Sequence, residues 1–201
     1  MNTCEPLIFT DLKKRTHALS IAQGFHDKLT QQHSYRVKKL CIALAQRFNL
    51  SSAEIAALKV SAVFHDIGKL GIPDRILLKA DKLDSQERQL LQLHPVIGQQ
   101  IINSINLKGA ADTAKIIRHH HEYFDGTGYP DKLKGDQIPI GARIISVVDS
   151  YDAMSYTRPY QQSRKHSDIM TILEQESENK HDPNIFQVFA DMIKTSPLKV
   201  R

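Results

Sequence analysis

Apolar residues recur at the spacing of a helical face along most of this chain. Between residues 37 and 48, one such face carries Val37, Leu40, Cys41, Leu44, Ala45 and Phe48. Intervals of three and four residues align side chains on one side of a helix, so this pattern predicts a helix with a buried stripe. Few segments alternate apolar and polar residues as strands do, and the expected fold class is therefore all-α.

Helix-start signals divide the rest of the pattern into further helices. Ser51 with Glu54, and Asp84 with Glu87, have the spacing of capping boxes and precede apolar residues of helical period. Later helices are predicted from Pro95 to about Ile105 and over 110–121, 139–154, 167–176 and 184–194. Residues 122–138 are rich in Gly, Pro and Asp, which predicts one long irregular loop between two of these helices.

Several imidazole and carboxylate side chains lie on the apolar faces of these helices. His33 is four residues before Val37, and Asp149 is four residues after Ile145. The full set, contributed by five helices, is His33, His65, Asp66, His94, His120, His121 and Asp149. Burying such groups without partners costs several kcal/mol each, and a shared cluster of cations would compensate all of them.

Taken one at a time, these residues have simpler explanations. An isolated His33 or His94 is more often a hydrogen-bonded core histidine, and Asp149 alone could cap a turn. Three consecutive histidines usually mark a solvated helix end, and this is the interpretation adopted for His119. The metal hypothesis is favoured because the simpler explanations would have to hold separately on five core faces.

The donor set also indicates which ions fit. Imidazole and carboxylate without thiolate suit Fe, Mn, Zn or Ni rather than a structural cysteine-zinc site, and Mg²⁺ stays open. The set exceeds the four donors of one tetrahedral ion, so two divalent ions bridged by a carboxylate are expected, with Asp66 as the bridge. Two ions about 3.5–4 Å apart are a known device for phosphoryl transfer.

The composition and net charge of the chain limit the classes of ligand that it is expected to bind. The chain has 201 residues, of which 41% are hydrophobic, and a net charge of +5. The mild positive charge suits an anionic ligand, but no basic tract is long enough for duplex nucleic acid. No signal peptide and no apolar run of membrane-spanning length is found, and two distant cysteines give no disulfide framework. A cytoplasmic protein that does not insert into a membrane is therefore expected.

Six segments together carry a family resemblance. "HSYRV", "HDIGKLGIPD", "HP", "HHEYFDGTGYP", "IPIGARIISVVDSYDAM" and "RPY" occur in that order. Over roughly residues 24–192 the chain resembles the HD-GYP domains of the HD phosphohydrolase superfamily. The resemblance implies an HD-domain-like helical bundle at residues 24–201 with a GYP-containing loop, after an extension at 1–23. It also implies two or three metal ions, usually iron or manganese, and hydrolysis of cyclic di-GMP to linear pGpG or GMP.

The resemblance assigns roles to individual residues. The seven imidazole and carboxylate residues on the apolar helix faces match the family's metal ligands, and Lys69 matches a lysine close to the scissile phosphate. Lys69 and Asp66 are the expected catalytic residues, and Lys69, Gly128, Tyr129 and Arg158 the expected substrate-binding ones. Members with three ions carry a glutamate where this chain has Leu29, so two ions are expected here.

The expected reaction is attack on phosphorus by a hydroxide that the two ions activate. Three alternatives stay open at this point: a hydrolase of another cyclic dinucleotide such as cyclic GMP-AMP, a non-catalytic cyclic di-GMP receptor, and a diiron redox sensor. Signalling-protein partners and a homodimer also stay open.

Overall fold

The protein is helical throughout the part of the chain that the computed structural model describes. This part comprises residues 28–156 and 162–200 with Leu12, Thr16, Leu19 and Ile21; of residues 28–30 it describes only the helical backbone. The elements are α2 (Lys28–Ala45), α3 (Ser52–Phe64), η1 (Ile67–Gly71), α4 (Asp74–Leu77), α5 (Ser85–Leu91), α6 (His94–Asn103), α7 (Ala110–His119), η2 (Gly135–Gln137), α8 (Ile140–Ser155), α9 (His166–Glu176) and α10 (Pro183–Lys194). The predicted all-α fold class is confirmed; the described residues form one isolated β-bridge, between Ser177 and His181.

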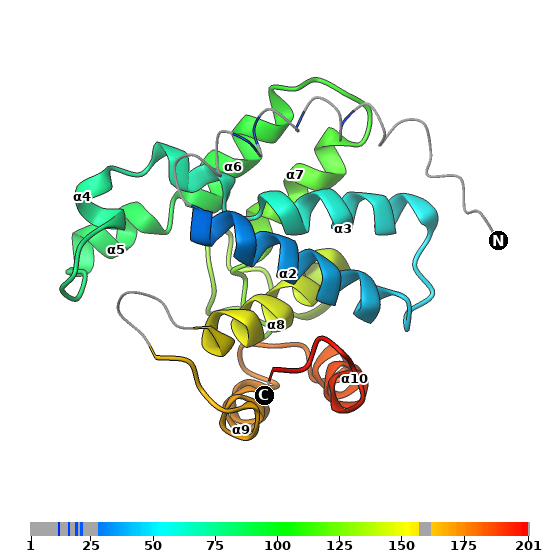
Figure 1. Ribbon diagram of the computed structural model, residues 1–201. Helices are drawn as coiled ribbons and strands as arrows, with labels where there is room; N and C mark the ends of the chain where they lie inside the picture. Colours follow the sequence, from blue (N-terminus) through cyan, green and yellow to red (C-terminus); the bar gives the residue numbers. More distant parts are fainter. Residues whose placement is uncertain are drawn as a thin grey trace.

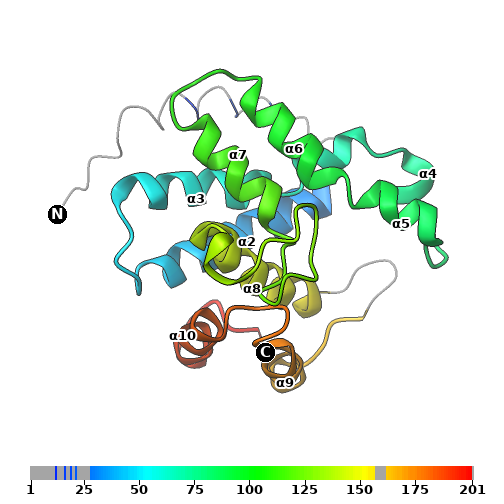
Figure 2. The same ribbon diagram turned by 180° about the vertical axis from the view of Figure 1, so that it is seen from behind.

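Helix α2 lies at the centre of the bundle. It packs against α3 on one side and α8 on the other, and α7 packs against both α3 and α6 (Figure 1). Helices α9 and α10 cover the other side of α8, and the view from behind shows α7 in front of α3, with α6 beside α7 (Figure 2). Leu44, Ile117, Ile145 and Phe189 are fully buried in the single core that these helices share.

Both capping boxes predicted from the sequence form in the structure. Ser51 and Glu54 form a complete capping box at α3, and Asp84 and Glu87 form another at α5. Such boxes satisfy backbone N–H groups that the first helical turn leaves without intrahelical partners. The sequence analysis did not predict the short elements η1, α4 and η2, which are too brief for a periodic pattern.

A close contact between η1 and α6 joins two halves of the bundle. A Cβ atom at Gly68 would lie 1.9 Å from the carbonyl oxygen of His94 and 2.6 Å from the nitrogen of Gly98. No side chain fits there, and glycine therefore lets the turn after α3 approach α6. This contact brings the His65–Asp66 pair next to His94.

Two further expectations concern the ends of the chain and the membrane. No helix among the described residues is long and apolar enough to cross a bilayer. The division into 1–23 and 24–201 stays a prediction, because most residues before Lys28 lie outside the described part, although Leu12 belongs to the core.

Candidate metal centre

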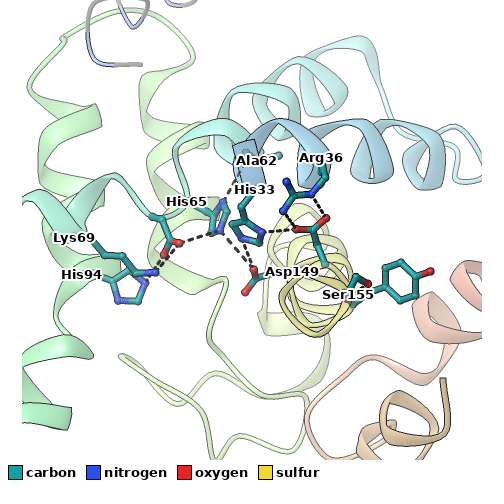
Figure 3. A network of polar contacts seen from close by, with 11 residues as sticks. His33, Arg36, Ala62, His65, Lys69, His94, Asp149 and Ser155 are labelled. Carbon is teal, nitrogen blue, oxygen red and sulfur yellow. Dashed lines mark hydrogen bonds and ion pairs between the residues drawn. The ribbon is translucent and has the colours of Figure 1, made fainter. Parts of the chain in front are cut away.

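Five separate segments bring their polar residues to one place in the bundle. His33 comes from α2, His65 and Asp66 from the end of α3 and the turn after it, and Asp149 from α8. Figure 3 shows His33, His65, His94, Lys69 and Asp149 close together. The two remaining predicted ligands, His120 and His121, follow the last residue of α7.

The donor atoms form two neighbouring groups. In each group the donor atoms lie within 4.8 Å of one another; the groups are His33, His65 and Asp66, and His94, His120 and His121. Asp149 joins the first group, because its Oδ1 lies 2.9 Å from Nε2 of His33 and 3.7 Å from Nε2 of His65.

Asp66 lies between the two groups. Its Oδ2 is 3.5 Å from Nε2 of His65, and its Oδ1 is 3.4 Å from Nε2 of His94. The side chain is 7% exposed, and Lys69 donates a hydrogen bond of 2.7 Å from Nζ to Oδ2. One carboxylate therefore faces both groups of imidazoles, and the lysine three residues later holds it from the solvent side.

Three of the histidine rings make the same hydrogen bond with the backbone. Nδ1 of His65, His94 and His120 lies within hydrogen-bond distance of the carbonyl oxygen three residues earlier, at 3.1, 2.8 and 2.6 Å. A carbonyl oxygen only accepts, so Nδ1 carries the hydrogen and Nε2 carries the lone pair. These carbonyls are free to accept because they belong to the last turns of α3, α5 and α7, where intrahelical donors run out.

The Nε2 atoms of these rings have no hydrogen-bond partner among the described residues, and all three are buried. Leaving a buried acceptor unsatisfied costs about 1–3 kcal/mol. A metal ion bound by several Nε2 lone pairs and a carboxylate compensates that cost at once, and this donor set suits divalent transition metals. The residues therefore fit metal ions on geometry, tautomer and chemistry.

The electrostatics agree with ligation by neutral imidazoles and charged carboxylates. Burial lowers the pKa of His94 to about 4 and that of His121 to about 3. Burial alone would raise the pKa of Asp66, but Lys69 and the neighbouring imidazoles hold it well below its usual range. Metal ligands must be deprotonated, and near pH 7 these three groups already are.

His33 behaves differently because carboxylates lie at both ring nitrogens. Burial alone would lower its pKa, but hydrogen bonds with Asp149 and Asp152 raise it to about 9. Nδ1 of His33 donates to Oδ2 of Asp152 at 2.7 Å, and Arg36 donates to both oxygens of Asp152 at 2.9 and 2.8 Å. The sequence analysis missed Asp152, although it follows Asp149 by three residues and so shares its helical face.

The loop after α7 contains a third group of potential donors, His119, Glu122 and Asp131. The expectation of a solvated His119 is wrong, because this residue is only 7% exposed. Its Nδ1 donates to the carbonyl of Lys115, and its Nε2 lies 2.9 Å from Oδ2 of Asp131. Glu122 accepts hydrogen bonds from the backbone N–H groups of Asp131 and Leu133. The group is fully paired and anchors the loop.

The predicted substrate-binding residues are placed less uniformly. Tyr129 stacks on His121 with ring centroids 5.0 Å apart, which places its ring against the second donor group. Gly128 is predicted to bind substrate; a Cβ there would lie 2.2 Å from the backbone nitrogen of Tyr123, so the packing of the loop itself requires glycine at this position. Arg158 lies outside the described residues, as does the side chain of Leu29.

The chain is similar to known proteins over most of its length. The family described as "HD domain" matches residues 17–185. The chain is 35% identical over 176 residues to a Cyclic di-GMP phosphodiesterase of Thermotoga maritima. The aligned residues make up 88% of this chain and 48% of that protein. It is 32% identical to the 3'3'-cGAMP-specific phosphodiesterase 2 of Vibrio cholerae, over 89% of this chain and 34% of that protein. This chain thus spans half or less of the length of both.

A solved structure supports the fold. The chain superposes on Bd1817, a HDG"Y"P protein from Bdellovibrio bacteriovorus, with a TM-score of 0.66 and 22% identity. The superposition covers 96% of this chain and 63% of the other.

Proposed function

The chain belongs to the HD domain family, and from this premise we propose that it is a metal-dependent phosphodiesterase of cyclic di-GMP, with linear pGpG, GMP or both as products. The observation that carries the proposal is the set of buried Nε2 lone pairs on His65, His94 and His120, which point into one cluster and lack partners among the described residues. The relatives supply the substrate class, because both are named for cyclic dinucleotides.

The proposed centre would hold two divalent ions, because imidazoles and carboxylates without thiolate suit such ions. The resemblance to the family favours iron, with manganese next. One ion would be held by His33, His65 and Asp149, the other by His94, His120 and His121. Asp66 would contribute to both, because its two oxygens face the two groups.

Bound ions would lower the pKa of water towards 7 and share the charge that develops on the phosphate oxygens. The protein's own residues would position the reacting groups. Lys69 is about one-third exposed and bonds to Asp66, so its flexible ammonium can reach a phosphate bound at the cluster and stabilise negative charge there. Tyr129, stacked on His121, and Arg158 are proposed to contact the dinucleotide.

The decisive experiment combines metal analysis with a hydrolysis assay. Protein purified without oxygen is analysed for metal content and for turnover of cyclic di-GMP, as wild type and as Asp66→Ala. We expect two equivalents of metal in the wild type, and loss of both metal and activity in the variant, because one carboxylate serves both ions. Full activity and full metal content in Asp66→Ala would overturn the proposal.

A second substrate, cyclic GMP-AMP, is favoured by the relative that is named for it. Turnover of cyclic di-GMP, 3'3'-cyclic GMP-AMP and pGpG, compared by chromatography on one preparation, separates the two assignments. Binding of cyclic di-GMP without release of a linear product from metal-loaded protein would instead identify a non-catalytic receptor.

A further inference from the structure

His33 differs from the other cluster histidines in its place on a helix. His65, His94 and His120 use carbonyls in the last turns of helices, whereas His33 lies within α2 (Lys28–Ala45). Carbonyls in a helix interior already accept intrahelical bonds. The Nδ1 hydrogen of His33 has its acceptor on another element.

Helix α8 supplies that acceptor. Asp149 and Asp152 lie three residues apart on α8 (Ile140–Ser155) and hold opposite nitrogens of the same ring. Asp149 lies 2.9 Å from Nε2 on the cluster side, and Asp152 lies 2.7 Å from Nδ1 on the far side. The ring of His33 is thus fixed between two carboxylates of one helix, as Figure 3 shows for His33 and Asp149.

Arg36 in turn fixes Asp152. Its guanidinium donates from Nε and Nη2 to the two oxygens of a carboxylate whose side chain is 3% exposed. The same guanidinium lies over the ring of Tyr156, 3.6 Å from its centroid. A two-pronged contact of this kind restricts the carboxylate to one orientation. Arg36 and His33 lie three residues apart, so α2 contributes both partners of Asp152 from one face.

We propose that Asp152, oriented by Arg36, is a positioning residue for metal binding, which sets the tautomer and direction of His33 and thereby retains the ion on the His33–Asp149 side. The inference rests on the proposed function only in requiring that ions occupy the cluster. Loss of a carboxylate behind a ligating histidine typically weakens metal binding 10–100-fold. A second ion, which His94, His120 and His121 would hold, should keep its affinity, because Asp152 contacts His33 and Arg36 rather than these three residues.

The chain offers a matched control. Asp131 is held by Nε and Nη2 of Arg118 and by a ring nitrogen of His119, the same three contacts that hold Asp152. The other ring nitrogen of His119 donates to a backbone carbonyl, so no lone pair is left for an ion. Asp131→Asn therefore perturbs an equivalent contact without a ligand behind it.

The test titrates Mn²⁺ into metal-free full-length protein and resolves two binding steps by calorimetry. For Asp152→Ala we expect one dissociation constant to rise about 10–100-fold and the other to stay unchanged. The bound Mn²⁺ that remains should broaden the ring NMR signals of His94, His120 and His121. Asp152→Asn keeps an acceptor oxygen for Nδ1 and should recover part of the lost affinity, and Arg36→Gln should lie between Asp152→Asn and wild type.

The results that overturn the proposal are equally specific. Equal weakening of both ions in Asp152→Asn and Arg36→Gln would show a structural role alone, and unchanged affinities would show no role. A comparable loss of one ion in Asp131→Asn would show that the effect is not specific to Asp152. Wild-type protein that binds two Mn²⁺ ions but hydrolyses no cyclic dinucleotide would refute the proposed function and leave the role of Asp152 intact.

Discussion

Two regions of this molecule use the same three residue types for different ends. In each, an arginine and a histidine hold one aspartate: Arg36, His33 and Asp152 in one, Arg118, His119 and Asp131 in the other. The two differ in the second nitrogen of the histidine ring. That of His33 lies 2.9 Å from Oδ1 of Asp149, another proposed ligand, whereas that of His119 donates to the backbone carbonyl of Lys115.

The comparison teaches how to tell a ligand group from a structural one in this chain. Proximity does not separate them, because His119, Glu122 and Asp131 gather as closely as the other two groups. What separates them is the buried Nε2 atoms of His65, His94 and His120, which have no hydrogen-bond partner among the described residues, whereas the loop group has no such atom there. Glu122 accepts two backbone N–H groups, and both nitrogens of His119 are engaged, so the loop group offers little to a cation.

The largest expected effect comes from two adjacent histidines. His120→Ala removes a buried Nε2 donor, so turnover of cyclic dinucleotide should fall by about 10²–10³-fold together with metal content. His119→Ala removes only loop contacts, so metal content should stay at the wild-type value while stability falls by about 1 kcal/mol. Metal analysis, hydrolysis assays and thermal unfolding of both variants check this prediction. If His119→Ala lost metal and His120→Ala did not, His119 rather than His120 would be the ligand.

A smaller effect is expected at the lysine that faces the cluster. Lys69→Met keeps the aliphatic stem but removes the ammonium, so kcat should fall about 10²-fold while metal content is retained. Steady-state kinetics with metal analysis separate these two quantities. Lys79→Met is the control, because Lys79 pairs with Glu87 away from the cluster. An unchanged kcat in Lys69→Met would exclude a role at the phosphate.

The smallest effect is the pH dependence of the loop group. Hydrogen bonds from Arg118 and His119 lower the pKa of Asp131 from 3.8 to about 2. A lowered pKa adds stability above the ordinary value, and that stability is lost as the pH falls through the folded-state value. Wild type should therefore be slightly more stable than Asp131→Asn at pH 7, and the difference should vanish between pH 3.8 and about 2. Urea unfolding across this range measures it; a difference that grows on acidification would contradict the assignment.

Much of the fold could be predicted from local pattern. The stripe through Val37 and Leu44 and the capping boxes at Ser51 and Asp84 predicted helices that the structure contains. The short elements η1 and α4 could not be predicted, because four or five residues hold less than two helical turns of pattern.

The candidate site divides in a similar way. The residues predicted as ligands from their positions on apolar stripes do lie close together in the fold. His33 and Asp149, for example, come from different helices and are in contact. Asp152 lies on the same stripe, seven residues after Ile145 and three after Asp149, so periodicity alone predicts that it points inward. His119 was misjudged because its partner Asp131 lies twelve residues later in the chain, and no local pattern reveals that contact.

Periodicity along the chain was enough to predict a helical fold and the helix faces that carry the proposed ligands, but it did not reveal that His119 is buried, and the burial of Asp152 was missed. Only the tertiary structure decided which ring nitrogens are engaged and which remain available. A histidine's tautomer depends on the acceptor at its other nitrogen, and that acceptor comes from a helix end for His65 and from a separate helix for His33.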